Sequence, residues 1–223
     1  MSLVVLNRMS RRIHLVDLNY KTLNLFPSNI HILEIDNFDN YKDQIVKDIY
    51  DEKDKDSEGR KLSNIGGWQS DAVGIEECKS RFIQKIMIES LTGFKPMSNK
   101  TYMKVEGWTN VNNPGDYNRL HDHPVSELSG VLWIKTPPNS GNLRFVTPQL
   151  FSRYKELDSY TQEFKEPTYS FMTYNFYPKE GTMLIFPSVL QHEVTENKSS
   201  EDRISYSFNI QLMGELNSKS FTN

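Results

Sequence analysis

The second half of the chain carries a series of short apolar segments, and this series constrains the fold more than any other feature. Each segment is rich in Val, Ile, Phe, Tyr or Trp and is bounded by Gly, Pro or Asn turns, a pattern typical of β-strands. Several short strands at this spacing predict a β-sandwich or jelly roll. The predicted strands cover residues 101–112, 128–135, 142–147, 168–177, 182–186 and 203–213.

The first 96 residues have a different pattern, because their apolar residues recur mainly at helical spacing. They predict one strand at residues 29–35 and amphipathic helices at residues 39–54 and 74–92. Gly93 closes the second helix. Cys78 lies on the apolar stripe of that helix, so we expect a small buried hydrophobic residue rather than a nucleophile.

Length and composition predict one soluble domain. Barrels and sandwiches of about 200–250 residues form single domains, so residues 1–223 are expected to be one unit. Residues 1–96 would be a strand and helix support region, and residues 97–215 would be the β-core. The fold class is therefore mainly β with flanking helices.

Charge and cysteine content narrow the surroundings in which the protein works. The net charge is −3, which gives no general attraction to nucleic acid or to an anionic membrane. The one cysteine excludes a disulfide within the chain and favours a reducing compartment. No apolar run reaches the roughly 18–20 residues that span a bilayer. We expect a cytoplasmic protein, with its oligomeric state open and a homodimer among the options.

Three of the five histidines form the most informative pattern of polar residues. His121 and His123 are two residues apart, so in an extended chain their imidazoles point to the same side. His192 follows a predicted strand and a turn. Neutral imidazole binds iron, zinc, copper and nickel, so the three side chains are candidate metal ligands. A surface pair at the end of a strand is the alternative interpretation.

An arginine downstream of these histidines predicts an anionic ligand. Residues 203–209 alternate polar and apolar side chains, with Arg203 and Ser205 on the polar face. If that face points inward, a buried guanidinium needs an anionic partner. Its planar fork suits a carboxylate that accepts two hydrogen bonds. A surface position for Arg203 is the alternative.

At this point the sequence resembles the iron(II)- and 2-oxoglutarate-dependent oxygenases, through the order His-x-His, a distal His, and Arg-x-Ser. More narrowly, it resembles a group of such oxygenases found in marine bacteria and cyanophages, which implies the host cytoplasm if a phage encodes it. The resemblance extends from about Leu25 to Leu212. The matching stretches are Leu25-Phe26-Pro27, residues 63–70 and 108–115, His121-Asp122-His123-Pro124, residues 128–131, Phe186-Pro187-Ser188, His192 and residues 203–209.

The resemblance implies a double-stranded β-helix, a cupin-like jelly roll, with residues 97–215 as its catalytic core. It implies that His121 and His192 hold Fe2+ near one mouth of the fold. Arg203, assisted by Ser205, would bind the far carboxylate of 2-oxoglutarate, a small-molecule co-substrate used together with O2. The implied function is a dioxygenase, a hydroxylase of some primary substrate, in which no catalytic residue beyond the metal ligands is assigned.

The sequence departs from the wider superfamily at the second ligand position. That position is usually Asp or Glu, whereas here it is His123. Three neutral imidazoles leave the metal with its full charge, which nearby acidic groups would have to offset. Asp122 and Glu127 are candidates for this, and Asp122 is also the alternative ligand to His123.

Other polar and aromatic residues carry weaker predictions. Asn110, Asn112 and Tyr117 precede the histidine pair and are candidates for contacts to 2-oxoglutarate or substrate, against turn chemistry and strand packing as alternatives. Trp108, Trp133 and Phe186 are expected in the core. Residues 149–169 interrupt the strands and predict a short helix or a long loop, and such insertions between strands are often lids or binding loops.

Two other functions remain open from the sequence. A jelly roll with three histidines also resembles cupin-type thiol dioxygenases, which use no 2-oxo acid. The other alternative is a non-catalytic metal-binding or interaction protein on the same fold.

Overall fold

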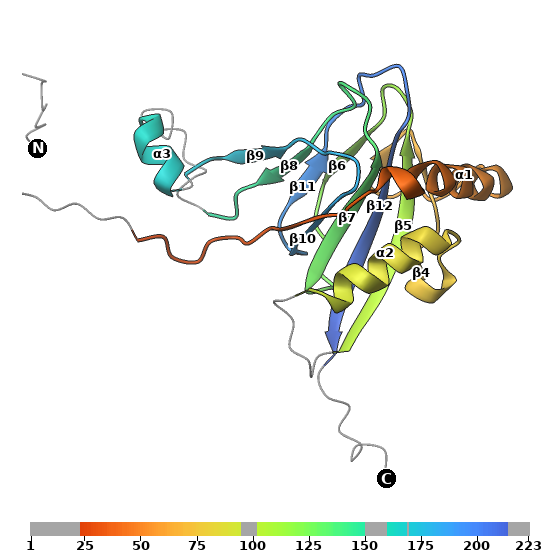
Figure 1. The fold of residues 1–223 in the computed structure, drawn as a ribbon. Coiled ribbons are helices and arrows are strands. Elements are labelled where there is room, and N and C mark those ends of the chain that lie inside the picture. The colour runs from red at the N-terminus through yellow and green to blue at the C-terminus, as the bar shows by residue number, and fades with distance from the viewer. Residues whose placement is uncertain (1–22, 95–101, 150–159, 169, 214–223) are drawn as a thin grey trace, which may run out of the picture.

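Two antiparallel sheets face each other in the computed structural model, which describes residues 23–94, 102–149, 160–168 and 170–213 (Figure 1). The larger sheet has the strand order β1-β10-β7-β12-β5-β3, and β4 also pairs with β5. Its strands are β1 (His31–Glu34), β3 (Trp68–Gln69), β4 (Val73–Gly74), β5 (Tyr102–Asn112), β7 (Leu128–Lys135), β10 (Thr182–Pro187) and β12 (Arg203–Met213).

The smaller sheet has the order β2-β6-β11-β8-β9. Its strands are β2 (Asn64–Ile65), β6 (Tyr117–His121), β8 (Leu143–Val146), β9 (Thr173–Phe176) and β11 (His192–Val194). From β5 to β12 the chain crosses repeatedly between the two sheets, which is the winding of a jelly roll. The predicted fold class, mainly β with flanking helices, is confirmed.

Two helices cover the outer face of the larger sheet (Figure 1). They are α1 (Asp39–Lys55) and α2 (Arg81–Thr92), and their apolar stripes carry fully buried residues such as Ile45 and Met87. These stripes pack with the outward side chains of the sheet into one hydrophobic cluster. Burial of such stripes supplies most of the stability of helices of this length.

A smaller apolar cluster fills part of the space between the two sheets. It contains Trp133, Phe145 and Phe186, each at most 4% exposed. The expected core positions of Trp133 and Phe186 are therefore confirmed. Because this cluster fills only part of the interior, the remainder is free to form a cavity.

The strand predictions were correct for the long apolar segments and less accurate elsewhere. The segment 168–177 was too long, because α3 (Gln162–Thr168) occupies its beginning and β9 starts only at Thr173. The helix predicted at 74–92 begins at Arg81, since Ile75–Glu77 form a 3-10 turn before it. Cys78 is therefore not on that helix, although it does pack against the core. The short strands β2, β3, β4, β6 and β11 were missed.

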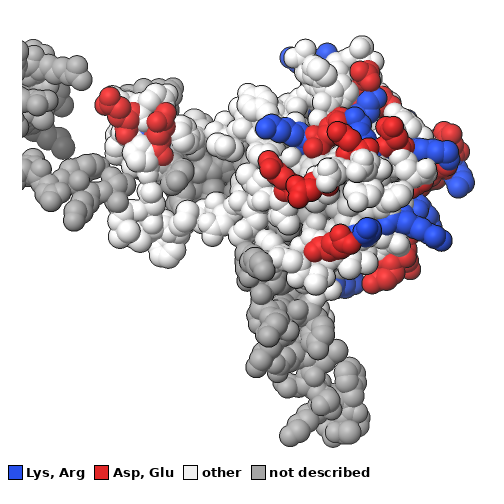
Figure 2. All heavy atoms as spheres, in the orientation of Figure 1, with Lys and Arg blue, Asp and Glu red and all other residues white. Residues whose placement is uncertain are grey.

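The insertion predicted between the strands contains the short helix α3. β8 and β9 extend away from the sandwich toward this helix (Figure 1). Near the start of the described chain, Asn24 Nδ2 donates to the carbonyl of Pro167 in α3 at 2.8 Å. Charges of both signs mix over the α1 and α2 side of the visible face, while the extension is largely uncharged outside α3 (Figure 2). Among the described residues, no helix is long and apolar enough to cross a membrane.

The two histidines outside the motifs differ in what the structure shows. His31 lies in β1, and its ring meets Phe94 edge to face with centroids 5.0 Å apart, which is a packing role. His14 lies outside the described residues.

Candidate metal centre and its cavity

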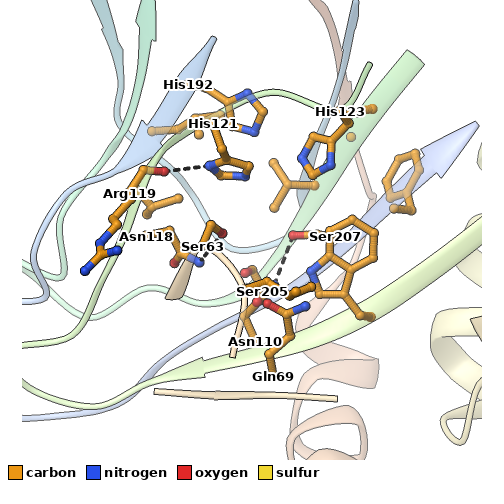
Figure 3. A pocket seen from close by; sticks show the side chains of 18 of the residues that line it. Ser63, Gln69, Asn110, Asn118, Arg119, His121, His123, His192, Ser205 and Ser207 are labelled. Atoms are coloured by element: carbon orange, nitrogen blue, oxygen red, sulfur yellow. Dashed lines mark hydrogen bonds between the residues drawn. The ribbon is translucent and has the colours of Figure 1, made fainter. Parts of the chain in front are cut away.

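A cavity of about 600 Å³ lies between the two sheets (Figure 3). One side of it is formed by the histidines on and beside β6 and β11. The other side is formed by inward-facing polar residues of β3, β5 and β12. Such a concave site with a few converging polar groups is the usual form of a small-molecule site.

The three predicted histidines come together at one side of this cavity. His121 ends β6 and His192 begins β11, and the two are direct cross-strand partners. His123 lies two residues beyond β6, where its backbone N–H donates to the carbonyl of Ser188 at 2.9 Å. One ring nitrogen from each of the three lies within 4.8 Å of the others. Strands distant in the sequence thus bring three imidazoles to one point.

Backbone hydrogen bonds fix how two of the rings are presented. Nδ1 of His121 is 2.6 Å from the carbonyl oxygen of Arg119, and Nδ1 of His192 is 2.8 Å from that of Leu190. A carbonyl can only accept, so in both rings Nδ1 carries the proton and donates. Nε2 then keeps its lone pair, which is the form in which imidazole binds metals.

Burial keeps the three imidazoles neutral. Desolvation, with a smaller contribution from the neighbouring His121, lowers the pKa of His192 to about 3 and that of His123 to about 4. Desolvation also lowers the pKa of His121. All three pKa values fall below their usual range, so the nitrogen lone pairs are available at neutral pH.

The nearby acidic residues do not join the group of histidines. Asp122 is exposed and lies outside the set of ring nitrogens within 4.8 Å, although its charge opposes the lowering of the pKa of both His121 and His123. Glu127 has another partner, because its Oε2 accepts from the backbone N–H of Leu212 at 2.8 Å. Of the two acids expected near the histidines, only Asp122 also lines the cavity.

A bulge in β6 decides which of its residues face the cavity. His192 pairs with His121 and Val194 with Asn118, so β6 advances three residues where β11 advances two. The extra residue reverses the alternation of side chains. Regular alternation would place Tyr117 on the face of His121. Instead, Asn118 is buried and lines the cavity, whereas Tyr117 is 37% exposed and lines a separate surface depression.

A row of buried side chains crosses the larger sheet opposite the histidines. Gln69 pairs with Asn110, Asn110 with Ser205, and Ser205 with Trp133. Directly paired residues point to the same face, and all four line the cavity. Each is at most 6% exposed. Gln69 and Asn118 were not expected from the sequence, and Trp133 was expected only as core.

Two further residues connect this row to the walls. Asn110 Nδ2 donates to Ser207 Oγ at 3.0 Å (Figure 3). Asn112, one of the residues expected near a co-substrate, is 3% exposed and lines the cavity, and its Nδ2 donates to Asn118 Oδ1 at 3.4 Å. Trp108 differs from the core position expected for it. It is only partly buried, it lines the cavity, and its ring centroid is 5.7 Å from that of His123.

Arg203 lies beside this row, one position beyond Ser205 on the same face of β12. It is 1% exposed, so the polar face of β12 does point inward. Nη1 donates to the carbonyls of Ser140 and of Thr195, the second at 2.9 Å. Nε and Nη2 have no hydrogen-bond partner among the described residues. Arg203 itself does not line the cavity. Its cross-strand partner Asn112 does, and so does Ser205, its neighbour on the same face of β12.

The electrostatics of Arg203 point to an anion. Desolvation lowers its pKa to about 10, with Asp116 acting in the opposite direction, so the guanidinium still carries its charge at neutral pH. A buried charge with two unpaired donors is costly unless an anion completes its hydrogen bonds. The free edge of the fork fits a carboxylate.

The sequence match agrees with this geometry. Residues 106–209 match the model of a family described as "Putative 2OG-Fe(II) oxygenase". The matched stretch runs from β5 to β12 and contains all three histidines, Arg203 and Ser205. Over this stretch the chain is similar to 2OG-Fe(II) oxygenases, and that family implies an oxidoreductase that uses Fe2+, 2-oxoglutarate and O2. No curated protein sequence matches the chain. The source in marine bacteria or their phages stays a prediction.

Solved structures support the same fold. A prolyl-4-hydroxylase from Pseudomonas putida is similar with a TM-score of 0.57 at 14% identity, covering 84% of this chain and 94% of its own. A Trichoplax adhaerens prolyl hydroxylase, solved with a peptide fragment of the hypoxia inducible factor oxygen degradation domain, gives 0.55 at 13%, with coverage of 82% and 83%. HygX from Streptomyces hygroscopicus, solved with nickel and 2-oxoglutarate, gives 0.50 at 10%, with coverage of 85% and 84%. The double-stranded β-helix is thus confirmed.

Proposed function

We propose that this protein is an Fe(II)- and 2-oxoglutarate-dependent dioxygenase that hydroxylates a primary substrate. His121, His123 and His192 would hold the iron, and Arg203 with Ser205 would bind the far carboxylate of 2-oxoglutarate. The observation that carries the proposal is the group of three neutral imidazoles whose nitrogens lie within 4.8 Å of one another. Within one cavity it faces a buried row of polar residues next to an arginine with two free donors.

The histidine side of the cavity fits a divalent metal. Three imidazoles suit iron, and three protein ligands leave coordination positions for other molecules. The bonds from Nδ1 to the carbonyls of Arg119 and Leu190 orient the rings before a metal arrives. When bound, iron would supply the redox chemistry that couples oxidation of the substrate to conversion of 2-oxoglutarate and O2 into succinate and CO2.

The chain's own residues would bind and orient the co-substrate. Arg203 is anchored through Nη1 to two carbonyls, so its remaining donors are held in a fixed direction rather than on a mobile side chain. Asn112, the cross-strand partner of Arg203, is placed beside this subsite. Such a preformed anion site costs little ordering when the ligand binds.

Asp122 would compensate for the neutral ligand set. Three imidazoles carry no charge, whereas a carboxylate at the position of His123 would partly neutralise the metal. The charge of Asp122 already opposes the burial that lowers the pKa of both His121 and His123, and the same field favours a cation at the histidine group. We propose His123 as the ligand and Asp122 as its charge partner.

The test begins with the metal, in the absence of O2. Equilibrium binding of Fe(II) should show one site per chain, which His192→Ala should abolish. His31→Ala is the matched control, because that histidine packs on Phe94 outside the cavity. The iron-loaded protein should then bind 2-oxoglutarate and release succinate once O2 is admitted. An iron-loaded, folded protein that neither binds nor consumes 2-oxoglutarate would reject the proposal.

The three-histidine ligand set also favours a second candidate, a cupin-type dioxygenase that needs no 2-oxo acid. Arg203→Met separates the two functions. Loss of 2-oxoglutarate binding in this variant supports the first, and unchanged O2 consumption supports the second. Arg144→Met is the matched control, since Arg144 pairs with Glu193 at 2.8 Å outside the cavity. If the protein is non-catalytic, metal analysis should find no iron in the wild-type protein. Its metal content should then equal that of the His192→Ala variant.

A further inference from the structure

One donor inside the cavity has no role in the function proposed above. Trp133 is 1% exposed and lines the cavity, yet its indole Nε1 has no hydrogen-bond partner among the described residues. Buried indole N–H groups normally find an acceptor, and leaving one unpaired is costly. An unpaired donor in the wall of a ligand cavity points to an acceptor on the ligand.

The other buried tryptophan shows how this chain normally treats such a group. Trp68 is 3% exposed and packs in the cluster beneath the helices. Its Nε1 donates to the backbone carbonyl of Asp56 at 2.6 Å. The two side chains have the same chemistry and similar burial, and only the one facing the cavity lacks a partner within the fold.

The strand register places Trp133 next to the subsite of the co-substrate carboxylate. Trp133 is the direct cross-strand partner of Ser205, so their side chains leave the sheet on the same face. Arg203 is two residues before Ser205 on the same face of β12, beyond a bulge at which Ile204 pairs with Lys135 and Ser205 with Trp133. Ser205 is thus flanked by Trp133 across the strands and by Arg203 along the inner face of β12.

The free donors near that position suit a carboxylate, whose two oxygens offer about four lone-pair directions. Arg203 has unpaired N–H groups on Nε and Nη2, and Trp133 has the unpaired Nε1–H. Ser205 adds a hydroxyl on the cavity wall. Trp133 supplies its donor from β7, whereas Arg203 and Ser205 supply theirs from β12.

We propose that Trp133 is a further binding residue for the co-substrate, whose indole N–H donates to the far carboxylate of 2-oxoglutarate beside Arg203 and Ser205. This inference rests on the proposed function, since it presupposes that 2-oxoglutarate occupies the cavity. It makes Trp133 a determinant of co-substrate choice, because the indole favours a 2-oxo acid with a second carboxylate over one without it.

The test compares two substitutions and two ligands. Trp133→Phe removes the N–H and keeps an aromatic side chain, and Trp68→Phe makes the same change at the matched site outside the cavity. The ligands are 2-oxoglutarate and 2-oxopentanoate, which has the same chain length and no far carboxylate. Dissociation constants are measured by calorimetry on the Fe(II)-loaded proteins without O2, and folding is checked by thermal unfolding of each metal-free variant.

We expect Trp133→Phe to weaken 2-oxoglutarate binding roughly 10- to 100-fold, the usual effect of losing a hydrogen bond to a charged group. Binding of 2-oxopentanoate should change by less than about threefold, and Trp68→Phe should alter neither affinity. An equal loss for both ligands would show that Trp133 only shapes the cavity, and no loss for either would also reject the inference. If wild-type protein binds no 2-oxoglutarate, it is the proposed function that fails instead.

Discussion

The two faces of strand β12 have opposite relations to the rest of the molecule. On the outer face, Ile204 and Ile210 are fully buried, and both belong to the hydrophobic cluster that also contains the apolar residues of α1 and α2. On the inner face, Arg203 and Ser205 are equally buried, yet Arg203 keeps two donors without a partner among the described residues. One strand thus carries an apolar core on one side and a polar surface with an incompletely paired charge on the other.

This difference separates what folds the protein from what binds its ligand. Apolar burial on the outer face stabilises the sheet whether or not a ligand is present. Unpaired buried polar groups on the inner face cost stability in the free protein and regain it when a ligand completes them. Substitutions on alternate residues of one strand should therefore have opposite consequences.

The largest effect should come from the outer face. Ile204→Ala should lower the free energy of unfolding by about 2–5 kcal/mol, because it opens a cavity in the cluster beneath the helices. Urea unfolding of the metal-free protein measures this loss. Ile32→Ala is the control, since Ile32 is 57% exposed in β1 and should cost less than about 0.5 kcal/mol. A small loss at Ile204 would contradict the idea that this face carries the stability.

The inner face should respond in the other direction. Arg203→Met keeps most of the volume and removes a buried charge with unpaired donors. We expect the free energy of unfolding of the metal-free protein to stay the same or rise, by up to about 1–4 kcal/mol, as when buried ionic groups are replaced by apolar ones. A clear fall in urea unfolding would show instead that the bonds to Ser140 and Thr195 make Arg203 a structural residue.

A smaller effect should follow at the neighbouring position. Ser205→Ala removes one hydroxyl from the subsite proposed for the far carboxylate, so 2-oxoglutarate should bind roughly tenfold more weakly. The free energy of unfolding should change little. Ser207→Ala is the matched control one step along the same face, because Ser207 accepts a hydrogen bond from Asn110. Equal losses of affinity in both variants, measured by calorimetry, would remove the distinction between the two serines.

The regular alternation of polar and apolar residues is also the reason why the sequence predicted β12 and its neighbouring strand β7. The strand at 203–213 and the one at 128–135 were predicted with correct bounds, because long apolar segments with a regular period leave little choice of structure. The grouping of His121, His123 and His192, and the inward position of Arg203, also agree with the geometry observed. These features depend on local spacing and on residue types with few structural uses.

Features that depend on partners distant in the sequence were not predictable in the same way. β11 has only three residues, and it exists because β6 and β8 pair with it on both sides. Gln69 reaches the cavity because β3 pairs with β5, so that Gln69 lies opposite Asn110, and nothing in its local sequence marks it. The sequence could not predict the free donor of Trp133 either, because a tryptophan in an apolar segment predicts only a position in the hydrophobic core.

The smallest predicted effect tests the bulge in β6, where alternation fails. The sequence made Tyr117 a candidate contact to 2-oxoglutarate, but the bulge directs Asn118 into the cavity instead. Tyr117→Phe should therefore change the dissociation constant of 2-oxoglutarate by less than about twofold, whereas Asn118→Ala should weaken it by a few-fold through loss of its bond to Asn112. The reverse order in calorimetry would mean that β6 pairs in regular register once ligand binds. The two faces of β6 would then be exchanged, which a one-residue shift of register produces in any strand.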